Sequence, residues 1–66
     1  MPSDRASAAA LTLAASTSHV ASIFSHLGAA TSTIQYVLIA SSSGLQQAVD
    51  QMNRDYINLA NALSGS

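Results

Sequence analysis

The large apolar residues of this chain recur at intervals of three and four positions, the spacing of side chains on one face of an α-helix. In the second half of the chain this stripe consists of Leu45, Val49, Met52, Tyr56, Leu59 and Leu63. In the first half a stripe of the same spacing consists of Leu13, Val20, Phe24, Leu27, Ile34 and Leu38, with threonines in its two gaps. Both stripes predict amphipathic helices that pack along another helix.

The two stripes do not share one phase. If the first stripe continued beyond Leu38, it would place the carboxylate of Asp55 in the apolar seam. We therefore expect the register to change at Ser41-Ser42-Ser43-Gly44, the strongest helix-breaking signal in the chain. Ser43 is expected to cap the helix that follows, with Gln46 completing a capping box.

These signals predict an all-α helical hairpin that forms a single domain, residues 1–66. Its expected elements are a long helix over 7–40, a turn at 41–44 and a second helix over 44–63. One alternative concerns the segment Thr33–Ile39, which is β-branched, aromatic and uncharged, and which also fits a β-strand or a cross-β segment. The heptad spacing that continues through Ile34 and Leu38 favours the helix.

Charged side chains are scarce, with two basic and three acidic residues, or 8% of the chain, against roughly 25% in an ordinary soluble domain. Two arginines are too few for the basic clusters that bind nucleic-acid phosphates. His19 and His26 are separated by two helical turns, so they cannot bind one zinc ion within a chain. We therefore expect no catalytic residues, no metal site, no cofactor and no nucleic-acid partner.

The first predicted helix lacks the charges that a water-facing helix normally carries. From Ala6 to Val49 no side chain has a formal charge. Beside the stripe, Ala14, Ala21 and Gly28 repeat every seven residues and form a row of small side chains that lets another backbone approach closely. Because two helices share only one interface, we expect the remaining faces to be covered by other copies, another protein or lipid.

Two other interpretations of the uncharged segment stay open. It is longer than the ~20 residues needed to span a bilayer, although polar residues interrupt it and basic flanks are missing. A chain rich in Ala, Ser and Thr and poor in charge can also be disordered in isolation and fold on assembly. At the N-terminus, Met1–Arg5 lacks the basic and apolar blocks of a cleavable signal peptide.

Five features bear on family: the short length, the Ser/Ala-rich N-terminus, the lack of Cys and Trp, the hairpin plan around Ser41–Gly44, and the amphipathic segment Leu45–Leu63. In these the chain resembles the needle subunits of type III secretion systems and the related Hrp-type pilus subunits. The resemblance implies a secreted, extracellular appendage that assembles as a hollow conduit without a cleavable signal peptide. It also implies that the C-terminal helix lines or nears the lumen.

The leading hypothesis is a structural subunit that self-associates into a filament or tube. Its interface residues would be the two apolar stripes, and Ala14, Ala21 and Gly28 would be its close-packing positions. The expected partners are copies of the chain, with a secretion apparatus or chaperone as a further partner. One alternative is a small cytoplasmic adaptor or chaperone that binds a partner helix. Another is a membrane-associated pilin or a pore-forming peptide.

Overall fold

The computed structural model describes the backbone from residue 2 to residue 65 and the side chains from residue 4 to residue 65. The chain forms three α-helices, α1 (Pro2–Leu27), α2 (Thr33–Ser42) and α3 (Leu45–Ser64). The predicted all-α class is confirmed, and Thr33–Ile39, for which a strand was the alternative, lies entirely within α2.

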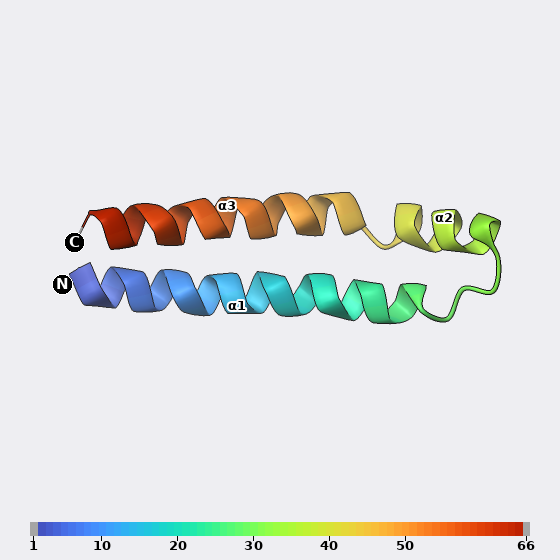
Figure 1. The fold of residues 1–66 in the computed structure, drawn as a ribbon, viewed down its shortest axis with the longest axis horizontal. Coiled ribbons are helices and arrows are strands. Elements are labelled where there is room, and N and C mark those ends of the chain that lie inside the picture. The colour runs from blue at the N-terminus through green and yellow to red at the C-terminus, as the bar shows by residue number, and fades with distance from the viewer. Residues whose placement is uncertain (1, 66) are drawn as a thin grey trace.

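The helices form a two-armed hairpin (Figure 1). α1 is one arm, and α2 followed by α3 runs back along it as the other, so the two ends of the chain lie side by side. Most contacts between helices join α1 to α3, and α2 contacts both only slightly. The result is a rod whose principal extents are 49, 14 and 13 Å.

The position of the chain reversal corrects the predicted boundaries. The helix expected over 7–40 is divided, because α1 ends at Leu27 and the chain turns through residues 28–32. At this end the backbone N–H groups of Ala29 and Ala30 donate to carbonyl oxygens three residues earlier, a tightening common at helix termini. Ser32 then caps α2, since its hydroxyl oxygen accepts a hydrogen bond from the backbone N–H of Gln35 at 3.2 Å.

The expected turn at 41–44 is instead a joint between α2 and α3, which run in the same direction (Figure 1). Gly44 precedes α3 with φ of 75°, a left-handed conformation that glycine adopts at little cost. The predicted capping box does not form: the Ser43 hydroxyl donates to the Ala40 carbonyl oxygen at 3.0 Å. The N-cap of α3 is Gly44, which has no side chain to serve as a cap.

The seam between α1 and α3 follows a heptad pattern whose positions we letter a to g. On α1 the buried or half-buried positions recur at intervals of three and four as Ala6, Ala9, Leu13, Ser16, Val20, Ile23 and Leu27. On α3 they recur in the same way as Leu45, Ala48, Met52, Asp55, Leu59 and Ala62. Each set alternates a and d positions, beginning with a at Ala6 and at Leu45. This is the pattern of two helices packed along one stripe each.

The buried core is small and lies toward the α2 end of the seam. It consists of Val20, Ile23 and Leu27 from α1 and Ala48 from α3, with Ile39, Ala40, Leu45, Val49 and Met52 packed against it. The accessible surface is 4603 Å², against about 3,900 Å² for a compact monomer of this mass. The Cα radius of gyration is 15.1 Å, against about 11 Å for a compact domain of this length. The hairpin therefore leaves much more of its surface uncovered than a globular fold does.

Candidate self-association surface

The twelve residues of the predicted stripes divide into two groups in the folded hairpin. Six occupy a positions of the seam and are buried or half-buried: Leu13, Val20 and Leu27 on α1, and Leu45, Met52 and Leu59 on α3. The other six lie outside the a and d positions of the seam: Phe24 on α1, Ile34 and Leu38 on α2, and Val49, Tyr56 and Leu63 on α3. The first group holds the hairpin together, and the second is the part of the stripes that remains available to a partner.

The seam of α3 corrects the expected phase. Asp55, which the stripe was expected to avoid, occupies a d position and is only 4% exposed. Tyr56, which was expected in its place, is 64% exposed. The small side chains of Ala48 and Ala62 occupy the neighbouring d positions, so the d positions of α3 carry no large apolar residue.

One long edge of the hairpin is apolar. In an antiparallel pair of helices, the e positions of both helices lie on one side of the seam and the g positions of both lie on the other. This follows from the two-fold axis that relates the two helices, because the axis exchanges the helices without exchanging the two sides of the seam. This edge therefore carries Phe24 from α1 and Val49, Tyr56 and Leu63 from α3, and we call these four residues the apolar edge. Phe24, Tyr56 and Leu63 are 50%, 64% and 59% exposed, and Val49 is half-buried.

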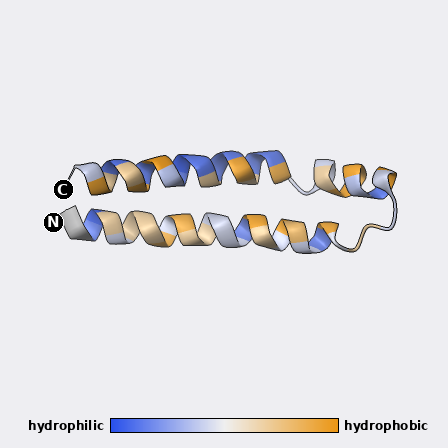
Figure 2. Ribbon diagram, viewed as in Figure 1, coloured by the Kyte–Doolittle hydropathy of each residue, from blue (hydrophilic) through white to orange (hydrophobic). Residues whose placement is uncertain are grey.

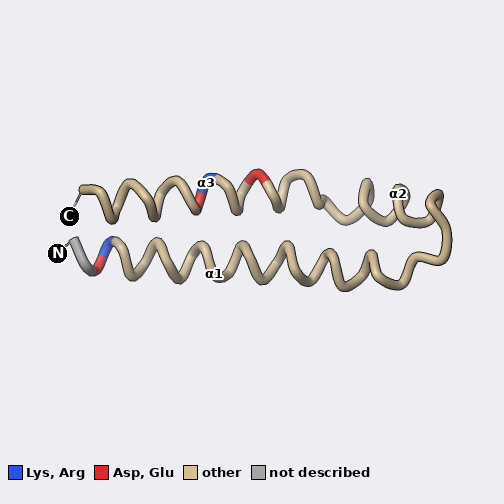
Figure 3. Tube along the Cα trace, viewed as in Figure 1, with Lys and Arg blue, Asp and Glu red and all other residues tan. Residues whose placement is uncertain are grey.

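The row of small residues lies next to this edge. Ala14, Ala21 and Gly28 occupy b positions, which follow the e positions around the helix, and all three are exposed. A Cβ atom built on Gly28 would lie 3.3 Å from the Ser25 carbonyl oxygen, so the helix end is tight at this residue. Neither the apolar edge nor the small row contains a charged side chain, and Figure 3 shows that α1 carries no charge beyond its first residues.

The opposite edge of the seam is polar. Its g positions carry Thr12, His19 and His26 from α1 and Gln51 and Asn58 from α3, and all are exposed. Gln51 covers the buried carboxylate: its side-chain amide donates to Asp55 Oδ1 at 3.0 Å. The Arg54 guanidinium in turn donates to Gln51 Oε1 at 3.0 Å. These two hydrogen bonds give the buried carboxylate a polar partner on the solvent-exposed polar edge of the hairpin.

Side-chain polarity differs between the two arms. The outward face of α3 is polar, whereas α1 carries mostly small or apolar side chains (Figure 2). By length and composition alone, α1 between Asp4 and Leu27 is also long and apolar enough to cross a membrane. The same test is passed by core helices and signal sequences.

Sequence reasoning missed two groups that shape this surface. The first is the capping pair Ser32 and Gln35 at the start of α2, which closes the turn over residues 28–32. It follows Gly28 closely and has the serine-to-glutamine spacing of a capping box. The seam alanines, Ala48 and Ala62, carry little weight in a pattern based on large apolar residues.

Among residues 4–65, no group of three or more His, Cys, Asp or Glu side chains is placed to hold a metal ion. Neither a protein-family model nor a curated protein nor a solved structure matches the chain.

Proposed function

We propose that the chain is a structural subunit that assembles with copies of itself through the apolar edge and the adjoining small row. The observation that carries this proposal is the exposure of Phe24, Tyr56 and Leu63 along one edge of a rod that cannot fold over to cover them. Large contiguous apolar surfaces on soluble proteins commonly mark interaction sites.

The chemistry of the surface favours a second copy as the partner. The edge and the small row contain large apolar side chains beside small ones, so knobs on one copy can enter the space above Ala14 and Ala21 of another. No charge on this surface has to lose its water when two copies meet.

The edge extends along most of the α1–α3 pair, which favours an open assembly. If the edge of one copy packs on the small row of the next, the contact is heterologous, and such contacts repeat into rings or helical filaments. A needle-like or pilus-like filament is the form that the resemblance to type III needle and Hrp-type pilus subunits suggests.

A membrane-associated subunit is the second candidate. It is supported by α1, in which Asp4–Leu27 is 24 residues long and apolar enough by composition to cross a bilayer. In that case α1 would have to separate from α3. Asp55 of α3 is buried in the hairpin seam, and if the pair stayed together its carboxylate would enter the bilayer with α1, which is costly.

Negative-stain electron microscopy of the purified chain over a range of concentrations tests the proposal. We expect elongated polymers above a threshold concentration in buffer without detergent, because burial of the apolar edge grows with every added copy. Particles that never exceed the size of a single hairpin would refute self-assembly. A chain that stays dispersed only in detergent would favour the membrane candidate.

A further inference from the structure

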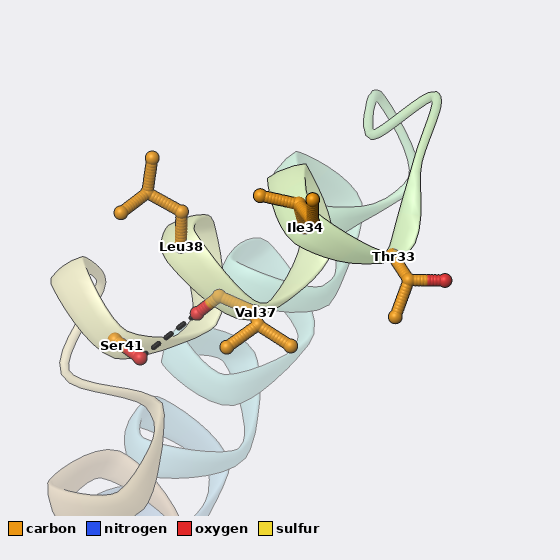
Figure 4. A pocket seen from close by; sticks show the side chains of 5 residues that line it. All are labelled: Thr33, Ile34, Val37, Leu38 and Ser41. Atoms are coloured by element: carbon orange, nitrogen blue, oxygen red, sulfur yellow. Dashed lines mark hydrogen bonds between the residues drawn. The ribbon is translucent and has the colours of Figure 1, made fainter.

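The α2 end of the hairpin exposes apolar side chains that belong to neither the seam nor the apolar edge. We call residues 28–44, which join α1 to α3, the tip. None of the ten residues of α2 is buried, and Ile34, Val37 and Leu38 are 81%, 56% and 66% exposed. Together with Thr33 and Ser41 these three side chains line a shallow apolar face (Figure 4).

The tip contains no charged side chain. All five charges of the chain lie elsewhere, either at the start of α1 or on α3 (Figure 3). The charge nearest in sequence is Asp50, beyond the Gly44 joint.

Several side-chain hydroxyls and one backbone N–H of the tip hydrogen-bond within the tip. Thr31 donates from its backbone N–H and its hydroxyl to Gln35 Oε1, at 2.8 and 2.6 Å. The hydroxyls of Ser41, Ser42 and Ser43 donate to carbonyl oxygens three or four residues earlier, at 2.8, 3.3 and 3.0 Å. Internal satisfaction of polar groups is what a lipid environment requires, because acyl chains offer no hydrogen-bond partners.

The size of the face also argues against a protein as its occupant. A stable protein–protein interface uses about 20–30 residues on each side, and the exposed face of α2 supplies only a few from a ten-residue helix. A bilayer needs no such minimum, because it closes around any apolar protrusion. A ten-residue helix is about 15 Å long, which is enough to lie in the interfacial layer and too short to span the bilayer.

We propose that the tip inserts into the interfacial region of a lipid bilayer, with Ile34, Val37 and Leu38 in the acyl layer and α3 outside it. This proposal does not rest on self-assembly, since the tip is separate from the apolar edge. Because the tip has no cationic side chain, insertion depends on apolar contact alone. Binding is therefore as strong on neutral as on anionic vesicles and is insensitive to salt.

A single tryptophan reports the environment of the tip, because the chain has none of its own. In the Ile34→Trp variant the reporter is on the exposed apolar face of α2, and in the matched Tyr56→Trp variant it is on α3. We expect emission from Ile34→Trp to shift to the blue by about 10 nm or more on addition of phosphatidylcholine vesicles, and to be quenched by brominated acyl chains, since interfacial helices bury their apolar face in the acyl boundary. Emission from Tyr56→Trp should not change.

Leu38→Asp in the Ile34→Trp background should abolish the shift, whereas Ile57→Asp on α3 should leave it unchanged. Circular dichroism of each variant confirms that the helices remain. No shift with vesicles overturns the proposal. A blue shift that rises with protein concentration and needs no vesicles assigns the tip to a second copy and also overturns it. Equal shifts from both reporters would mean that the whole rod lies on the membrane, which contradicts insertion by the tip.

Discussion

Small side chains decide how α1 and α3 meet. Five of the six d positions of the seam hold small or polar residues, Ala9 and Ser16 on α1 and Ala48, Asp55 and Ala62 on α3, and the sixth is Ile23. Small residues let helix backbones approach closely, but they bury little apolar area, at ~0.8 kcal/mol for each buried methylene. The hairpin therefore depends on a few large a and d residues near the α2 end for most of its apolar burial.

Asp55 is the seam residue whose replacement should stabilise the hairpin. Leucine at this position would add apolar area to the seam and remove a carboxylate that is only 4% exposed. We expect Asp55→Leu to raise the free energy of unfolding by about 1 kcal/mol or more, and the midpoint of thermal unfolding by about 4–8 °C.

Asp50→Leu is the matched control, since Asp50 is an exposed aspartate on the same helix, and its effect should stay within about 0.5 kcal/mol. Thermal unfolding followed by circular dichroism measures both variants. A lower midpoint for Asp55→Leu would mean that the two hydrogen bonds through Gln51 stabilise the fold by more than the burial costs.

The same small residues explain why the phase of the seam was predicted wrongly. A pattern that counts large apolar residues selects Val49, Tyr56 and Leu63 at e positions of α3 over Ala48, Asp55 and Ala62 at d positions. On α1 the pattern selects Phe24 over Ile23 although both are large and apolar, and the packed helices bury Ile23. The a positions are common to both choices, so half of each stripe was placed correctly. Only the packing of the two helices distinguishes a small seam residue from a small surface residue.

At the scale of elements, α2 is an independent segment set by the signals at its two ends. The break at 28–32 combines a glycine with the Ser32 cap, and the joint to α3 uses Gly44 at φ of 75°. The helical content of residues 7–40 and 44–63 was predictable from periodicity. The position of the chain reversal was not predictable from periodicity, because both breaks contain Gly and Ser. The tertiary contact between α1 and α3 selects the first break for the reversal.

Gly44 should be sensitive to the handedness of its backbone. Alanine at a left-handed position costs about 1–2 kcal/mol, whereas asparagine tolerates it better. We expect Gly44→Ala to lower the urea midpoint clearly and Gly44→Asn to lower it less. A Cβ atom at Gly44 meets only the Gln47 side chain, at 3.8 Å, so crowding does not obscure the comparison. Equal urea midpoints for the Gly44→Ala variant and the wild-type chain would show that the backbone at Gly44 is not left-handed in solution.

At the scale of the whole molecule, the two edges of the rod have opposite character. The polar edge carries the two histidines and the Gln51 amide that donates to Asp55, and the apolar edge has no charge and lies beside the small row. An extended hairpin with one such edge is only half covered by its own fold. The apolar edge is therefore the surface through which we propose that copies associate.

Met52 cannot test this claim, because it is half-buried in the intramolecular seam and a charge there would damage the hairpin itself. Tyr56 and Ile57 are better placed. They are adjacent on α3 and 64% and 56% exposed, but Tyr56 is on the apolar edge and Ile57 is on the outward face.

The most direct measurement is sedimentation velocity of the wild-type chain, Tyr56→Asp and Ile57→Asp at matched concentrations. We predict that wild type and Ile57→Asp assemble alike, and that Tyr56→Asp stays near its 6.7 kDa monomer mass until its concentration is raised by at least about tenfold, because a charge must lose its water in the interface. Equal assembly of Tyr56→Asp and wild type, or a wild-type chain that remains monomeric throughout, would contradict the account.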